Sequence, residues 1–271
     1  MVLIVNKIEI NIFFIYYNQK MDIIYKLPLP DEICSKIFMF ACKTPHTRLG
    51  IEVLKNKLNM DIINLPEKDE DVTCIDKDEV LDYTSNDAID IYFYTLFNNL
   101  TSIDLDSTGV TGDLIHLRTL PKLTRIVLGD TYINGDISHL NSLQNLTMIW
   151  INHTGVTGDI VHFTSLSKLT EIDVANTGVY GDIACLNSLP NLTKIFLGNT
   201  GVSGDIAHLK SLPNLTNIYL YSTGVSGDIS HLKSLPNQRL VSLWDTCVTG
   251  NEELFHKYRE NAGLEECRIT F

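Results

Sequence analysis

The sequence predicts an α/β repeat solenoid with a curved parallel sheet, short helical turns on the convex side and a small helical N-terminal region. One frame, LTxIxLxxTGVxGDIxHLxSLPN, recurs without a gap across residues 100–250. Its period, about 23 residues, lies in the range of solenoid proteins. The segment LTxIxL alternates apolar and variable residues, as a strand does. One such unit cannot bury its own apolar face, so the units must stack on one another.

The strand segment and the turn after it resemble the leucine-rich repeat family, whose pattern LxxLxLxxNxL the frame matches across residues 100–250. The GDI that follows resembles the variant in which a second short strand comes after the first. The Asn of the family pattern is Thr here, and a Thr hydroxyl can also bond to loop backbone. We therefore expect a ladder of hydroxyls at Thr108, Thr131, Thr154, Thr177, Thr200, Thr223 and Thr246.

Two further columns of the frame carry structural predictions. A Gly stands in every repeat, which predicts a left-handed backbone angle or a close approach of neighbouring coils; it occupies Gly112, Gly135, Gly158, Gly181, Gly204, Gly227 and Gly250. The next residue is Asp113, Asp136, Asp159, Asp182, Asp205, Asp228 or Asn251. Each precedes a short helix, so we expect helix N-caps. A cation-binding acidic ladder is the alternative; the His three residues later forms an open row, and we predict no metal and no cofactor.

The predicted partner-binding surface is the concave side of the strands, where variable side chains point. Aromatic residues gather there, and exposed aromatic clusters are typical of interaction sites. They are Trp150, Phe196, Tyr219, Tyr221 and Trp244. Acidic residues make the N-terminal part of this face negative: Asp104, Asp106 and Asp130. The alternative is that the rings only shield strand backbone, because cross-strand aromatic pairs stabilise sheets.

Composition narrows the function classes. The net charge of −12 argues against nucleic acid as a partner. The six cysteines are scattered, without metal-ligand spacing, which predicts a reducing, intracellular, cytoplasmic setting. The motifs GxSxG, GxxxxGK[ST] and HExxH are absent from the sequence, so we predict no enzyme.

The N-terminal third precedes the repeats. Residues 1–20 are apolar but interrupted by Lys7 and Glu9, which disfavours a membrane-spanning helix; a strand, an added extension and a membrane anchor stay open. Residues 21–65 are predicted to be helical. Their opening, LPLPDEICSKIFMF, resembles the start of the F-box, covering residues 27–40. That resemblance implies a Skp1-type adaptor bound through residues 27–58; the alternative is a helical pair that plugs the end of the solenoid.

The array should be closed at both ends. Residues 66–99 are predicted to be an acidic linker followed by a degenerate first repeat that acts as a cap. Residues 251–271 are predicted to be the C-terminal cap, with a helix over 252–261 and a last strand. The sequence thus predicts a protein-interaction module that binds another protein, with a substrate adaptor of a ubiquitin ligase as the alternative.

Overall fold

The computed structural model describes residues 73–76, 91–96 and 99–271. The chain divides into two compact units, Met1–Lys57 and Leu58–Phe271, and every described residue belongs to the second. The predictions for residues 1–20 and for the helical region 21–65 with its F-box-like start therefore lie outside the described residues, as do residues 66–72, 77–90 and 97–98 of the predicted linker and N-terminal cap.

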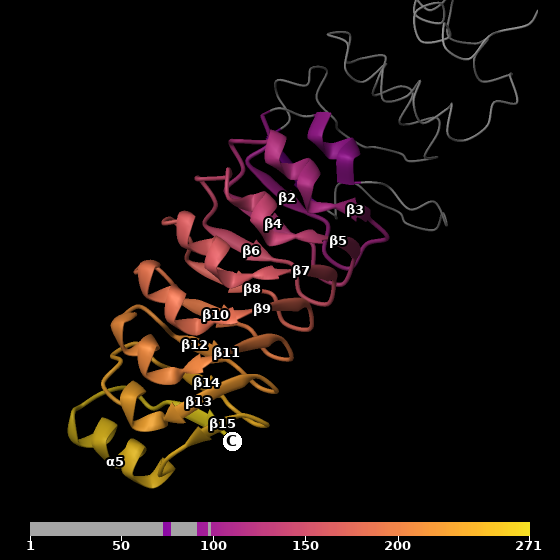
Figure 1. Cartoon of the computed structure of the whole chain (residues 1–271). Coiled ribbons are helices and arrows are strands. Elements are labelled where there is room, and N and C mark those ends of the chain that lie inside the picture. Colours follow the sequence, from indigo (N-terminus) through magenta and orange to yellow (C-terminus); the bar gives the residue numbers. More distant parts are fainter. Residues whose placement is uncertain (1–72, 77–90, 97–98) are drawn as a thin grey trace, which may run out of the picture. The chain divides into compact units, whose positions relative to one another are not determined.

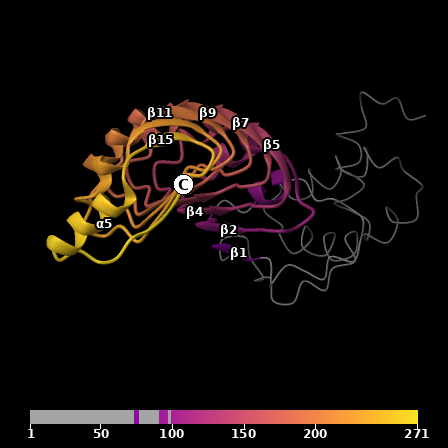
Figure 2. The ribbon, with the colours of Figure 1, turned by 90° about the horizontal axis from the view of Figure 1, so that it is seen from below.

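The described chain coils repeatedly into two parallel sheets (Figures 1 and 2). The nine-stranded sheet contains, in spatial order, β1 (Cys74–Asp76), β2 (Ser102–Asp104), β4 (Arg125–Val127), β6 (Met148–Trp150), β8 (Glu171–Asp173), β10 (Lys194–Phe196), β12 (Asn217–Tyr219), β14 (Leu240–Ser242) and β16 (Arg268–Thr270). The seven-stranded sheet contains β3 (Thr111–Asp113), β5 (Tyr132–Asp136), β7 (Gly155–Asp159), β9 (Gly178–Asp182), β11 (Gly201–Asp205), β13 (Gly224–Asp228) and β15 (Cys247–Thr249). The second short strand predicted for each repeat is confirmed.

Short 3-10 helices complete the coils and stack on one another along one side of the array (Figure 1). They are η4 (Ile91–Leu96), η5 (Leu114–Thr119), η6 (Ile137–Leu140), η7 (Ile160–Ser165), η8 (Ile183–Ser188), η9 (Ile206–Ser211) and η10 (Ile229–Leu232). One longer helix, α5 (Glu252–Asn261), follows the last coil. The helical turns that the sequence predicts are thus 3-10 helices of four to six residues. Helices of this type occur as short pieces of this kind.

The core consists of the side chains at the apolar positions of the repeat. The central residue of each strand in the nine-stranded sheet is buried, as Ile149 and Ile172 show. The Val or Ile of the second strand and the apolar residues of each 3-10 helix close the interior, and Phe163 takes the place that Leu fills in other coils. Stacking is what removes these side chains from water, and that burial is the main force holding the array together.

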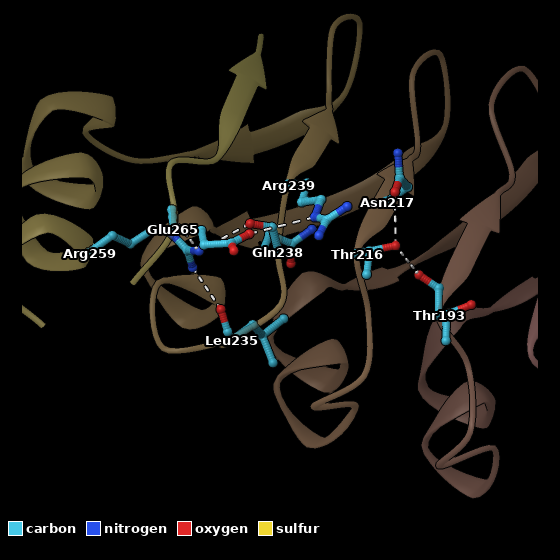
Figure 3. Close-up of polar contacts among 8 residues, drawn as sticks. All are labelled: Thr193, Thr216, Asn217, Leu235, Gln238, Arg239, Arg259 and Glu265. Carbon is cyan, nitrogen blue, oxygen red and sulfur yellow. Dashed lines mark hydrogen bonds and ion pairs between the residues drawn. The ribbon is translucent and has the colours of Figure 1, made fainter. Parts of the chain in front are cut away.

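Two Thr columns play different roles, and the expected bond of the loop Thr hydroxyl to loop backbone is confirmed. The loop Thr does not bridge coils: its hydroxyl donates to the carbonyl oxygen three residues earlier in its own turn, at 2.5–2.6 Å in all seven repeats. The ladder between coils comes from the Thr that opens each strand. Thr216 Oγ1, for example, donates to the Thr193 carbonyl oxygen at 2.9 Å (Figure 3). The ladder runs from Thr101 and ends at Arg239, which keeps only the backbone bond to Thr216.

The Gly column is held by backbone geometry, as predicted. Its seven members have φ between 103° and 131°, where a side chain is strained. A Cβ at Gly158 would also lie 2.7 Å from Asp136 Oδ1 of the preceding coil. The residue before each loop Thr is left-handed too, with φ of 50–58°, a feature that we did not predict from the sequence. Ser, Asp, His and Asn fill that column, and Asn and Asp are the types that tolerate this conformation best.

The Asp column caps the 3-10 helices, as predicted. Each carboxylate accepts the backbone N–H two residues later at 2.7–2.9 Å. Asn251 caps α5 through its side-chain oxygen, which accepts the backbone N–H of Leu254, three residues later, at 2.8 Å. Each of these oxygens thus has a backbone partner, which offsets the repulsion within the column.

At the C-terminal end, a single arginine satisfies the last turn of the array. Arg259 of α5 is 2% exposed and donates to the carbonyl oxygens of Leu235, Gln238 and Glu265 (Figure 3). Burial lowers the pKa of its guanidinium, although an arginine stays charged at any ordinary pH. Arg259 therefore supplies, from a side chain, donors for carbonyls in the turn that no further repeat covers.

Candidate protein-interaction face

The candidate site lies on the solvent side of the nine-stranded sheet. We call this surface the variable face. It consists of the first and third residues of β2, β4, β6, β8, β10, β12 and β14, together with the residue two positions after each of these strands. The central residue of each strand points inward, which leaves its neighbours on the opposite side. The third residues pair in register from strand to strand, in the order Asp104, Val127, Trp150, Asp173, Phe196, Tyr219 and Ser242.

Four aromatic residues form two stacked pairs, which we call the aromatic cluster. The Phe196 and Tyr219 rings have centroids 4.8 Å apart. Tyr221 and Trp244 stack almost in parallel, with centroids 5.3 Å apart and planes 4° apart. Trp244 is 48% exposed, and the other three are part-buried. The first pair lies on β10 and β12, and the second lies two positions after β12 and β14. Trp150 is not part of the cluster, because Asp173 stands between Trp150 and Phe196 in the register.

Packing and exposure are combined in this cluster. The Tyr221 ring lies over the backbone of Gly198, so closely that a Cβ there would collide with it. Its hydroxyl also accepts a hydrogen bond from Asn176 Nδ2 at 3.3 Å. Tyr221 therefore has a structural role, as expected of rings that shield strand backbone, whereas Trp244, at the edge of the pair, keeps nearly half of its surface open.

The acidic residues lie at the other end of the variable face. Asp104 is part-buried and forms an ion pair with Arg125 at 3.0 Å, so its charge is offset. Asp106 and Asn152 reach over Gly129 from the two neighbouring coils, since a Cβ at Gly129 would lie 2.6 Å from an oxygen of each. Asp130 is exposed beside the variable face, on the loop after β4, in the left-handed conformation.

Asp173 joins this acidic end, and it was not among the predicted site residues. Its Oδ1 accepts the backbone N–H of Ala175 at 3.1 Å. Burial, with smaller contributions from Asp106 and Asp130, raises the pKa of Asp173 from 3.8 to about 6, and His153 acts in the opposite direction. The carboxylate is thus held where it is poorly solvated, which costs free energy when it is ionised.

Similarity to known proteins is found in structure and not in sequence. No family model and no curated protein matches the chain, whereas solved structures do. The Arabidopsis receptor kinase HAESA, in complex with the peptide hormone IDA and the co-receptor SERK1, superposes with a TM-score of 0.58 at 23% identity over 67% of this chain. A TDR receptor gives 0.56 at 26% over 67%, and the internalin InlF of Listeria monocytogenes gives 0.54 at 21% over 67%.

All of these are leucine-rich repeat proteins with parallel stacked strands. The fold of this chain is a leucine-rich repeat solenoid. The chain spans only 31% of the HAESA chain, 32% of the TDR receptor chain and 50% of the internalin chain.

On this leucine-rich repeat solenoid, the first residue of each strand also belongs to the variable face, although none was predicted as a site residue. Lys194 and Glu171 form an ion pair across β10 and β8 at 2.9 Å. The alternation that singled out the third residues would also have singled out these.

Among the described residues, no group of three or more His, Cys, Asp or Glu is arranged to hold a metal. No described helix is long and apolar enough to cross a membrane.

Proposed function

We propose that this chain is a non-enzymatic protein-interaction module that binds another protein through the variable face of its solenoid. The observation that carries the proposal is the aromatic cluster, two stacked ring pairs with Trp244 open to solvent. Large aromatic residues on a rigid surface are the usual anchors of protein interfaces. The fold supports the proposal, and HAESA, which shares it, forms a complex with a peptide hormone and a co-receptor.

The test is quantitative affinity purification with the whole chain, followed by affinity measurement with the purified partner. Trp150→Ala, Tyr219→Ala and Trp244→Ala should each weaken binding, by about 2 kcal/mol, or about 30-fold in Kd, at a true hot spot. The matched control is Tyr132→Ala, which removes a ring that is 74% exposed on the seven-stranded sheet and should leave binding unchanged.

Thermal unfolding of each variant separates binding from packing. Trp244→Ala should keep the wild-type melting temperature within a few degrees, because its ring is half-exposed. If Trp244→Ala and Tyr219→Ala both unfold the array, the rings are packing elements and the proposal fails. If they fold and bind the partner normally, the binding surface lies elsewhere.

The F-box-like start at residues 27–40 supports a second proposal, in which this module selects substrates for a ubiquitin ligase. Its basis is the sequence alone, LPLPDEICSKIFMF. The test is a binding measurement between the full chain and a purified Skp1-type adaptor, with Ile37→Asp as the variant that disrupts the motif. Absence of binding by the wild-type chain would rule this adaptor role out.

The intracellular setting proposed from the scattered cysteines is checked by fractionation of expressing cells.

A further inference from the structure

The variable face changes character along the stack of coils. Acidic side chains lie on or beside the first four of the seven repeats: Asp104, Asp106, Asp130, Glu171 and Asp173. The aromatic cluster lies over the last three coils. The whole chain carries a net charge of −12, so a basic partner is favoured at long range.

Asp173 differs from the other strand carboxylates of this face. Asp104 is paired with Arg125, and Glu171 is paired with Lys194. Among the described residues, Asp173 forms no ion pair, and its carboxylate accepts a hydrogen bond from the Ala175 backbone. An Asn would accept that bond equally well, so the local fold does not require the charge. Burial raises the pKa of Asp173, because its carboxylate is poorly solvated when it is ionised, and the charge of His153 lowers that pKa only in part.

The neighbours of Asp173 would suit such a cation. Trp150 lies beside it on β6 and Phe196 beside it on β10, both in register and on the same face. A carboxylate between two aromatic residues offers an ammonium or guanidinium group an ion pair together with ring faces, which attract cations. A bound metal ion is disfavoured there, because no three ligands converge among the described residues.

Trp150 borders this place on one side. Its indole Nε1–H is buried and has no acceptor among the described residues, so the part of Trp150 that a partner can meet is its ring. A basic residue of a bound segment would supply a cation for Asp173 and ring contact with Trp150 together.

We propose, building on the proposed function, that the partner presents an extended segment whose Lys or Arg docks at Asp173 between Trp150 and Phe196, and whose large apolar residue covers the Tyr221–Trp244 pair. Three strand steps separate β8 from β14, which is about 14 Å at the spacing of a sheet. An extended chain covers that distance in about four residues. The basic and apolar residues of the segment are therefore about four positions apart.

The experiment uses the full chain and a random 12-residue peptide display library as the probe. Peptides enriched on the wild-type chain are synthesised, and their Kd is measured at pH 7.5 by fluorescence anisotropy. We expect enrichment of Arg or Lys about four positions from an aromatic or large aliphatic residue. Replacing that Arg by citrulline, which keeps the shape and removes the charge, should weaken binding at least 10-fold.

The protein variants locate the contact. Asp173→Asn should weaken the Arg peptide at least 10-fold and leave the citrulline peptide unchanged, so that the two changes are not additive. Asp182→Asn, which changes the same residue type at a helix cap of another surface, should change neither. The affinity of the Arg peptide should also fall between pH 7.5 and 5.0, because protons compete with the peptide cation for Asp173. The other ionisable side chains that act on Asp173 are His153, Asp106 and Asp130.

Different outcomes separate this inference from the proposed function. Enriched peptides that lack a basic residue but require Trp244 would overturn the inference and leave the proposed function standing. Arg peptides that bind Asp173→Asn and wild type equally would do the same. Peptides that bind equally to Trp244→Ala, Trp150→Ala and Asp173→Asn would contradict both. If no peptide is enriched, a short extended segment is not the ligand and the inference fails, while the proposed function is judged on the purified partner.

Discussion

The guanidinium of Arg259 donates through Nη1 to the carbonyl oxygen of Leu235 at 2.7 Å, across the interior of the C-terminal end. Inside the array, the equivalent turns are covered by the next coil. At the end, α5 supplies one side chain that donates to the carbonyl oxygens of Leu235, Gln238 and Glu265 and, at 3.4 Å, to that of Lys233. A buried charge is tolerated here because its N–H groups are used in hydrogen bonds.

Arg259→Lys should destabilise the protein by about 3 kcal/mol or more, because a single ammonium cannot reach the carbonyls of Leu235, Gln238 and Glu265 together. Urea unfolding measures the change. The matched control is Arg239→Lys, whose side chain is 69% exposed and forms only a 3.6 Å ion pair with Glu265. That variant should be neutral within about 0.5 kcal/mol. Equal losses in the two variants would contradict the role assigned to Arg259.

Gly158→Ala should cost more than about 1 kcal/mol, because Gly158 has φ of 120° and a Cβ would lie 2.7 Å from Asp136 Oδ1. Gly155 lies in the same strand, β7, but has no positive φ, and a Cβ there would come no closer than 3.4 Å to its neighbours. Gly155→Ala should therefore be mild. The two melting temperatures decide the matter, and an unchanged value for Gly158→Ala would refute the role of backbone geometry in the Gly column.

Asp182→Ala should cost about 1 kcal/mol, because the cap bond to the Ala184 N–H at 2.8 Å is lost. Asp182→Asn should be nearly neutral, since an amide oxygen caps a helix about as well. Thermal unfolding of the three proteins gives the comparison.

The same column provides a test of the ion-binding alternative. Calcium or zinc at millimolar concentration should leave the melting temperature unchanged if the carboxylates are caps. A stabilisation by either ion that disappears when Asp159 and Asp182 are both replaced by Asn would show that the column binds cations after all.

Asp173→Asn should stabilise the free protein at pH 7, by up to about 3 kcal/mol if the whole rise in the Asp173 pKa is relieved. The folded state raises the pKa of Asp173 from 3.8 to about 6, so it binds the proton more tightly than the unfolded chain does. The wild-type carboxyl group therefore costs nothing at low pH, becomes costly as pH rises from about 4 to 6, and keeps its full cost above pH 6.

The advantage of Asp173→Asn should accordingly shrink between pH 6 and 4 and vanish below pH 4. Urea unfolding of both proteins at pH 4, 5, 6 and 7 gives the curve. A variant that is less stable than wild type at pH 7 would show that the carboxylate stabilises the fold, and would remove one argument for a cation supplied by the partner.

Much of the fold could be predicted because the same short segment, with the same local structure, recurs along the chain. The alternation in LTxIxL assigns Ile149 and Ile172 to the core, and the order Gly158–Asp159 before a short apolar run marks a turn with a cap. The left-handed column at Asn176 and Asn199 left a weaker signal, a preference for Asn, Asp, Ser and His. Asn, Asp and Ser are also common in loops where φ is negative, because their side chains bond to nearby backbone.

The sequence by itself determined the repeat length, the two strands per coil, the core letters and the two columns that hold Trp150 and Trp244 on one face, because these depend only on spacing along the chain. The tertiary structure decided which residues of different coils lie close together in space. It paired Asp104 with Arg125, left Asp173 without a cation between two aromatic residues, and placed Arg259 under the last turn. Such contacts join residues about 20 positions or more apart. Burial and charge at each of them depend on how the coils stack, which no single repeat encodes.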